Sequence, residues 1–431
     1  MAEIKREKYL ERLIAHKGNG RVKIVTGIRR CGKSYLLFQL FKRHLLESGV
    51  KPSHKRDNMI CEIRGDYCFV WMNTFEKILA LLRCELWGEQ LACEVTADDI
   101  DGILAMAEEQ GVSGLVANAI IGSNLPIGDV KTVDVCTVQR LHELKCRDMN
   151  KKVSRFAAFL NRRELKYAVM KGQTMATLYP HPLMRSCGDI DFYCPKDSFK
   201  EVQRVIEERL GVEMHHNWSE RHDNFVIKDC TFEMHSDMMI FGARSHQRYW
   251  DSFFDEALAS EPSHVVIDEI EVKTLSPTLD ALYIFTHLFG HFMTGCSLKQ
   301  WCDWAMVLHC YRDEIRKEEL ERHLQGLGLL KAYRAMGFWL VEKLGLPQEE
   351  FPFALEDEDK RWLTKLHRNV MTMRGENVAK DRKIGHHVSM AHTLMTASLV
   401  ARQSVSFFRL APKEMLWTFP KMASWSVRKR M

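Results

Sequence analysis

The sequence predicts an α+β protein in which a small mixed β-sheet is flanked by an N-terminal helical leader and a C-terminal helical region. Three observations predict this class. Residues 74–121 repeat apolar side chains at helical spacing, residues 165–275 hold short apolar runs bounded by turn residues, and the chain from residue 277 onward returns to the helical pattern. A strand–loop–helix unit precedes these regions. With 431 residues, the chain is long enough for two to three domains.

The composition argues against several classes of protein but does not identify one. The net charge of +5 is small beside 62 basic and 57 acidic side chains, so it permits a nucleotide or nucleic-acid partner without requiring one. The cysteines are odd in number, 13, and form no C-x-x-C pair, which argues against a disulfide framework or a zinc ribbon. No signal peptide and no membrane span are evident. We therefore expect a cytoplasmic protein with no membrane partner.

The first residues contain a phosphate-binding motif. GIRRCGKS fits G-x-x-x-x-G-K-S, with Gly27, Gly32, Lys33 and Ser34 at its defining positions, between an apolar strand at 22–26 and a helix at 34–47. The first 48 residues strongly resemble the start of a family of bacterial AAA-type ATPases. No further strand–helix unit follows before residue 70, although a nucleotide-binding sheet needs several. We therefore interpret residues 1–50 as a truncated P-loop ATPase-like fragment.

A P-loop enzyme also needs a second acid at the end of a distant buried strand. HVVIDEI, residues 264–270, is the string that has this form. Asp268 and Glu269 stand between two short β-branched runs, however, which predicts the tip of a hairpin.

Residues 51–72 form a polar junction, and residues 73–164 are predicted to be the helical leader. Helices cover 74–121, with Ala-Asp-Asp at 97–99 as a start signal inside that span. A third helix is predicted over Val135–Arg163, with charge on one face and an apolar face carrying Leu141, Leu144, Phe156 and Leu160.

Residues 165–275 alternate strand signals with one helix, and are predicted to be the catalytic core. YAVMKG is a short strand that ends at a glycine, GDIDFYCP is a strand stopped by Pro195, and FKEVQRVIEERLG is a helix between strands. Two hairpins follow. The first is expected to turn near Lys228 and Asp229, and the second near Asp268 and Glu269.

The core holds a carboxylate pattern suited to a metal. Asp189 and Asp191 lie two apart in a predicted strand, so their side chains point to the same face and repel each other unless a cation lies between them. Glu233, on the following hairpin, is the candidate for a third acid, and Asp237 competes for that role because it shares the alternation. Three carboxylates that bind Mg²⁺ are typical of sites for phosphoryl or nucleotidyl transfer.

Residues on the phosphate side are predicted at the preceding turn. Lys171 and Gly172 end a strand, and the backbone N–H groups that follow them, with the lysine ammonium, are suited to hold a triphosphate. Arg185 either neutralises phosphate charge or forms a structural ion pair with acids. Gly188, which opens G-D-I-D, is grouped with the nucleotide-binding candidates.

These segments together carry a family resemblance. KGQTMATLYPHPLMRSCGDIDFYCP, then FEMH, then HLFGHFMTGCSLKQWCDWAMVLHCYRDEI, resembles the uncharacterised nucleotidyltransferase family of bacteria, within the polymerase-beta-type superfamily, over roughly residues 70–430. The resemblance implies a minimal nucleotidyltransferase fold, with Asp189 and Asp191 as metal ligands and Glu233 as the third acid. The superfamily commonly opens its motif with Gly-Ser, where this chain has Lys171-Gly172-Gln173. The resemblance supplies no acceptor.

The C-terminal region, residues 276–431, offers two pairs of polar residues at i and i+4. His287 and His291 have a spacing suited to a metal, but no third ligand is obvious, so core packing with a buried hydrogen bond is favoured. Lys299 and Asp303 are predicted to form a helix ion pair, with a role toward substrate as the alternative. Nearby aromatic and methionine side chains are assigned to the core: Trp301, Trp304 and Met306.

The leading functional hypothesis is a Mg²⁺-dependent nucleotidyltransferase that moves a nucleoside monophosphate from an NTP to an unknown acceptor and releases pyrophosphate. One alternative is an ATP-binding protein or ATPase that acts through residues 27–34. Another is a regulatory protein that binds nucleotide without turnover.

Overall fold

The computed structural model describes residues 66–217, 222–260, 262–372 and 390–417. The chain divides into two compact units, Met1–Phe75 and Glu76–Met431, and apart from residues 66–75 everything that follows concerns the second. The predicted P-loop residues, Gly27, Gly32, Lys33 and Ser34, lie outside the described residues, as do the predicted elements around them.

The leader is helical, as the sequence predicts. Its elements are α5 (Asp66–Trp87), the 3₁₀ turn η3 (Ala97–Asp99), α6 (Ile100–Glu109), α7 (Ser113–Gly122) and α8 (Asp129–Asn161). The Ala-Asp-Asp start signal is the turn η3, where the Asp99 carboxylate accepts hydrogen bonds from the Thr96 backbone N–H and hydroxyl, 2.8 Å each. The third helix begins earlier than predicted, at Asp129, directly after Gly128.

A five-stranded mixed sheet forms the centre of the fold, in the order β1-β2-β5-β4-β3. Its strands are β1 (Ala168–Met170), β2 (Ile190–Tyr193), β3 (His215–Asn217), β4 (His222–Ile227) and β5 (Cys230–His235). β2 and β5 run parallel, and the other neighbours are antiparallel. The predicted helix between strands is α10 (Phe199–Leu210), and short segments between β1 and β2 form α9 (Gln173–Ala176) and η4 (Pro182–Met184).

Both predicted hairpins are present. β4 and β5 turn at Lys228 and Asp229, where Lys228 has φ 57°. β6 (Ser263–Ile267) and β7 (Ile270–Thr274) form a separate two-stranded hairpin, and its turn residues Asp268 and Glu269 have φ 46° and 65°, as a two-residue hairpin turn requires. Asp268 and Glu269 are therefore a hairpin tip and not the second acid of a P-loop enzyme.

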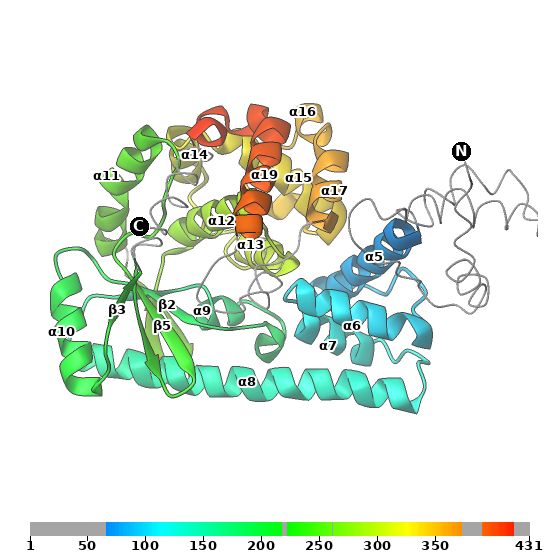
Figure 1. Ribbon diagram of the computed structural model, residues 1–431, viewed down its shortest axis with the longest axis horizontal. Helices are drawn as coiled ribbons and strands as arrows, with labels where there is room; N and C mark the ends of the chain where they lie inside the picture. Colours follow the sequence, from blue (N-terminus) through cyan, green and yellow to red (C-terminus); the bar gives the residue numbers. More distant parts are fainter. Residues whose placement is uncertain (1–65, 218–221, 261, 373–389, 418–431) are drawn as a thin grey trace, which may run out of the picture. The chain divides into compact units, whose positions relative to one another are not determined.

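The sheet packs between α8 on one face and helices that follow it in the sequence on the other (Figure 1). Phe156 of α8 lies 4.9 Å from Phe192 of β2 and 4.8 Å from Phe232 of β5, measured between ring centroids. On the opposite face Tyr193, the next residue of β2, contacts Phe254 of α11 (Arg244–Ser260) at 5.9 Å. Because side chains alternate along a strand, Asp191 points with Tyr193 away from α8.

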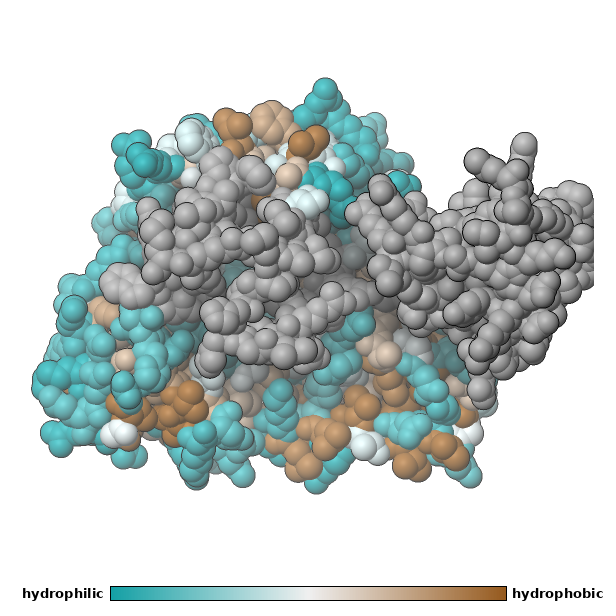
Figure 2. Space-filling view, in the orientation of Figure 1, coloured by the Kyte–Doolittle hydropathy of each residue, from teal (hydrophilic) through white to brown (hydrophobic). Residues whose placement is uncertain are grey.

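Two of the four residues predicted on the apolar face of α8 are buried and two are exposed. Phe156 and Leu160 are buried, but Leu141 and Leu144 are 61% and 50% exposed. At about 100° per residue, Leu144 falls roughly 160° around the helix from Leu160, so one face cannot hold both. The lower edge of Figure 2, where α8 lies in Figure 1, accordingly shows apolar patches among the polar ones.

The C-terminal region is helical, as predicted. Its elements are α12 (Pro277–Thr294), α13 (Leu298–Cys310), α14 (Lys317–Gly326), α15 (Leu330–Trp339), the π-helical turn η5 (Leu340–Leu344), η6 (Gln348–Glu350), α16 (Asp357–Lys360), α17 (Leu363–Thr372), α19 (Met390–Phe407) and η7 (Phe408–Leu410). Trp301, Trp304 and Met306 are core residues, with exposed fractions of 0%, 0% and 1%. None of the described helices combines the length and the apolar composition that a membrane crossing requires.

We predict that Phe156→Ala destabilises the protein by about 3–5 kcal/mol, because it removes the ring that α8 places against the sheet and leaves a cavity. The matched control on the same helix is Leu141→Ala, which removes an exposed side chain and should change the free energy of unfolding by less than about 0.5 kcal/mol. Urea unfolding followed by circular dichroism measures both. Equal effects of the two substitutions would contradict the packing described for α8.

Candidate active site

Two of the predicted acids lie side by side on neighbouring central strands. Asp191 of β2 and Glu233 of β5 are register partners in the parallel pair, so their side chains lie on the same face of neighbouring strands, about 4.8 Å apart in backbone spacing. Asp191 is 3% exposed and Glu233 is partly exposed. Asp189 lies just before the first residue of β2, rather than inside the strand as predicted.

Asp191 is held by two basic side chains. Its Oδ1 lies 3.3 Å from Lys171 Nζ and 3.2 Å from His235 Nε2. Burial opposes ionisation of Asp191, but the positive charge of Lys171 and the hydrogen bond from His235 outweigh it and hold the pKa of this carboxyl below its usual value. Burial likewise opposes protonation of His235, and hydrogen bonds to Asp191 and Glu233 outweigh it and raise the pKa of the imidazole.

Lys171 reaches Asp191 because of an unusual turn. Lys171 and Gly172 follow β1 with φ 46° and 63°, a left-handed conformation that costs little at the glycine. Lys171 Nζ also donates to His287 Nε2 of α12 at 3.2 Å. Burial and the nearby Lys171 charge keep the pKa of His287 well below 6.5, so this imidazole is neutral and accepts the bond. His291 Nε2 lies 3.1 Å from the same His287 Nε2, so the two histidines are in contact, at part-buried positions beside Lys171.

Asp189 is the acid whose charge is least compensated. It forms no ion pair within the described part of the chain, and the negative charge of Asp191, with burial, raises its pKa. Glu233 contributes to the same shift, which places the three acids in one electrostatic field. Beside Asp189 is Gly188, which is exposed and has no other heavy atom within 4 Å of the position where a Cβ would stand. An open, negatively charged position beside Asp189 suits a divalent cation with oxygen ligands.

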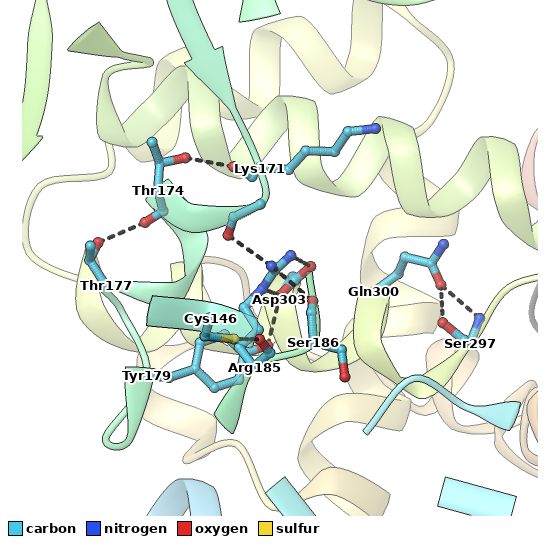
Figure 3. A network of polar contacts seen from close by, with 11 residues as sticks. Cys146, Lys171, Thr174, Thr177, Tyr179, Arg185, Ser186, Ser297, Gln300 and Asp303 are labelled. Atoms are coloured by element: carbon cyan, nitrogen blue, oxygen red, sulfur yellow. Dashed lines mark hydrogen bonds and ion pairs between the residues drawn. The ribbon is translucent and has the colours of Figure 1, made fainter. Parts of the chain in front are cut away.

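Arg185 lies in a buried ion pair, the structural role that the sequence left open for it (Figure 3). Its Nε and Nη2 donate to the two carboxylate oxygens of Asp303, 2.7 Å each, and the Tyr179 hydroxyl donates to the same carboxylate at 2.7 Å. Arg185 Nη1 donates to the carbonyl oxygen of Gly172 at 2.8 Å. The guanidinium is 2% exposed and its bonds tie α13 to the Lys171–Gly172 turn. A contact between Arg185 and nucleotide stays a prediction.

The predicted ion pair between Lys299 and Asp303 is not formed, because Arg185 occupies the Asp303 carboxylate. Lys299 is half-buried at the start of α13 and forms no ion pair with the described residues. Burial, and then the charge of Arg185, lowers its pKa, while Asp303 and Asp189 act in the opposite direction. Lys299 therefore has no ion-pair partner among the described residues and lies in the same electrostatic field as Asp189.

The helical leader positions Lys299. The Gln110 side-chain oxygen accepts from the Leu298 backbone N–H at 3.0 Å, and its carbonyl oxygen accepts from the Lys299 N–H at 3.2 Å. These bonds satisfy two of the free N–H groups at the start of α13. The next residue, Gly111, has φ 67°, and a Cβ added there would stand 3.4 Å from Lys299 Cβ. The leader thus contacts the lysine stem closely.

Sequence reasoning missed two histidines. Among the described His, Cys, Asp and Glu residues, the group whose ligand atoms all lie within 4.8 Å of one another is His222, Glu233 and His235. The three predicted acids together are not grouped that closely. His235 could have been found by the alternation that selected Glu233 and Asp237. Asp237 itself follows β5 and pairs with Lys196 at 2.7 Å.

A short helix follows the turn that was predicted to bind phosphate. The helix after Gly172 is α9, which has four residues, and all four are buried. The Gln173 side chain donates to Asn150 of α8 and so is committed to the protein interior. The role of Lys171 and Gly172 toward a triphosphate stays a prediction.

Comparison with known proteins identifies one family. Residues 96–344, more than half of the chain, match the family described as "Uncharacterised nucleotidyltransferase". A solved structure of an antigenic nucleotidyltransferase-like protein from Paracoccidioides brasiliensis matches 41% of this chain and 86% of that chain, with 14% identity and a TM-score of 0.29. That TM-score is too low to bear on fold or activity. No curated protein is similar enough in sequence to count as a match.

We predict that Asp303→Asn destabilises the protein by about 3–5 kcal/mol, because it leaves the buried Arg185 guanidinium without its counter-charge. The control is Asp313→Asn, which removes the partner of Arg312 in a surface pair at 3.5 Å and should cost less than about 1 kcal/mol. Chemical denaturation of both variants measures the difference.

The Arg185–Asp303 pair should make the stability of the protein depend on pH. Burial opposes ionisation of Asp303, but Arg185 outweighs it and lowers the pKa of the carboxyl, so the unfolded state binds the proton more readily. The stabilisation is therefore present above about pH 4 and is lost as the pH falls through the folded pKa. The stability gap between the parent protein and Asp303→Asn should narrow at low pH. A constant gap from pH 7 to pH 3 would contradict an ionised Asp303.

Proposed function

Because the chain belongs to the uncharacterised nucleotidyltransferase family, we propose that it transfers a nucleoside monophosphate from an NTP to an acceptor, with Mg²⁺ as cofactor and pyrophosphate as the second product. The observation that carries the proposal is the electrostatic field shared by Asp189 and Asp191, at the start of β2, and Glu233, the register partner of Asp191 on β5. Such a concentration of carboxylates costs free energy without a cation and is favourable with one.

The donor set fits Mg²⁺. Asp189 and Asp191 supply hard carboxylate oxygens, and Asp189 has no competing ion pair among the described residues. When bound, Mg²⁺ would neutralise phosphate charge and favour attack at the α-phosphorus. The charge of Lys171, which lies 3.3 Å from Asp191, favours the ionised carboxylate that a metal ligand requires.

The chain's own residues account for the remaining steps. An acceptor hydroxyl forms a bond to the α-phosphorus, the bond to the pyrophosphate oxygen breaks, and the hydroxyl proton passes to Glu233, the acid that is partly open to solvent. Lys299 replaces Lys171 as the residue we assign to the triphosphate, because Lys171 is already held by Asp191 and His287. A triphosphate would provide the counter-charge that Lys299 lacks.

We predict that Asp189→Asn lowers transfer of label from α-labelled NTP by about a hundredfold or more, because it removes a ligand and charge that act on the reacting phosphate. Asp189 forms no ion pair with the described residues, so the variant should remain folded, as a thermal melt would verify. The matched control is Asp197→Asn, which removes an exposed carboxylate paired with Lys166. The assay offers each NTP with candidate acceptors and measures pyrophosphate.

Three results would contradict this assignment. Asp189→Asn could label acceptors as well as the parent does. Nucleotide could bind with metal while no pyrophosphate is released, which would support a regulatory protein. Phosphate release that depends on Lys33 and not on Asp189 would support the P-loop alternative.

We predict that Lys299→Gln raises KM for NTP about 10- to 100-fold and lowers kcat much less, because the lysine contacts the triphosphate in both ground and transition states. Lys299→Arg should recover part of the loss by restoring the charge. Lys200→Gln, on the exposed side of α10, should leave KM unchanged. If Lys299→Gln left KM at the parent value, the assignment of Lys299 to the triphosphate would be wrong.

A further inference from the structure

His222, Glu233 and His235 form a cluster. The proposed transfer reaction assigns a role to Glu233 but none to the two histidines. β4 and β5 are antiparallel, and His222 is the register partner of His235, so the two imidazoles lie on the same face of neighbouring strands. Their ring centroids are 4.9 Å apart. Glu233 is two residues before His235 on β5 and therefore points to the same face.

The Nε2 atoms of both histidines lie near one carboxylate oxygen of Glu233. Glu233 Oε2 lies 3.6 Å from His235 Nε2 and 3.9 Å from His222 Nε2, and all three ligand atoms are within 4.8 Å of one another. Ligands of a tetrahedral metal with bonds of about 2.0–2.2 Å are separated by roughly 3.3–3.6 Å. The separations of 3.6 Å and 3.9 Å from Glu233 Oε2 are at or near this range.

The chemistry of the cluster differs from that of the acidic pair beside it. Asp189 and Asp191 offer carboxylate oxygens, which suit Mg²⁺, whereas two imidazoles with one carboxylate suit Zn²⁺, Mn²⁺ or Co²⁺. His222 is 3% exposed and Glu233 is 23% exposed, so one ligand is rigidly buried while solvent reaches the other side of the cluster. Three protein ligands with one side open is the arrangement of a metal site that can accept a further ligand.

We propose that His222, Glu233 and His235 bind a divalent transition-metal ion, at a position next to the Asp189–Asp191 pair and distinct from it. Bound through Oε2, the ion leaves Oε1 of Glu233 for the acceptor's proton, and it draws His235 away from its hydrogen bond to Asp191. Glu233 is thereby the residue that links this site to the acidic pair. The metal site does not depend on the transfer reaction, since its three ligand atoms come from β4 and β5 alone.

The test uses the full chain, freed of metal with a chelator and titrated with Co²⁺ while visible absorption is recorded. We expect one Co²⁺ per chain with d–d bands, displaced by Zn²⁺ but not by millimolar Mg²⁺. His222→Gln and His235→Gln should each weaken Co²⁺ binding at least about tenfold. Glu233→Gln, nearly identical in shape, serves as a third variant if a histidine variant fails to fold.

The matched control is His264→Gln. His264 lies on the β6–β7 hairpin with its Nε2 3.9 Å from Glu271 Oε1, so it reproduces a His–Glu pair at the surface without the second histidine. This variant should bind Co²⁺ as the parent does. Thiolate ligation elsewhere in the chain would be recognised by its charge-transfer absorption.

Asp189→Asn separates this proposal from the proposed function. It should abolish nucleotidyl transfer and keep Co²⁺ binding. Co²⁺ bands that persist in His222→Gln and disappear in Asp189→Asn would assign the ion to the acidic pair and overturn the proposal. Absence of Co²⁺ binding in the parent protein would overturn it as well, and neither result would bear on the transfer reaction.

Discussion

The arrangement of the candidate active site depends on the buried ion pair between Arg185 and Asp303. Burying two charges costs several kcal/mol, and here a bidentate contact, the Tyr179 hydroxyl and the Gly172 carbonyl together satisfy them. The pair joins three segments that are far apart in sequence: the turn after β1, the segment before β2, and α13. Because the guanidinium holds the Gly172 carbonyl, it also holds the left-handed turn that aims Lys171 at Asp191.

The acids around this ion pair differ in how far basic side chains compensate their charge. Lys171 and His235 neutralise Asp191, Arg185 neutralises Asp303, and Asp189 is left with a raised pKa and no ion pair among the described residues. The position that remains negative is therefore the one beside open space at Gly188, where a cation or a metal-bound phosphate can approach. The helical leader contributes to the same arrangement, since Gln110 caps α13 and so places Lys299.

The sequence predicted elements well where the signal was local and partners poorly where it was not. Both hairpins, the strand that carries Asp191 and the helix after Pro195 follow from turn residues and alternation, which act within a few positions. The burial of Leu141 and Leu144 was predicted wrongly, and for Leu144 the reason is its position about 160° around α8 from the buried Leu160. The expected Lys299–Asp303 pair failed because a buried arginine from another segment binds that carboxylate more completely than an i+4 lysine would.

By itself the sequence determined the α+β class, the strand carrying the acids and the resemblance to a nucleotidyltransferase family, because periodicity and motif spacing are properties of neighbouring residues. Only the tertiary structure decided which charges meet: that Lys171 is held by Asp191 and His287, that Arg185 is committed to Asp303, and that two histidines stand beside Glu233. These contacts join residues as far as 118 positions apart. Their energies depend on burial and on distances of a few ångströms, which no local pattern encodes.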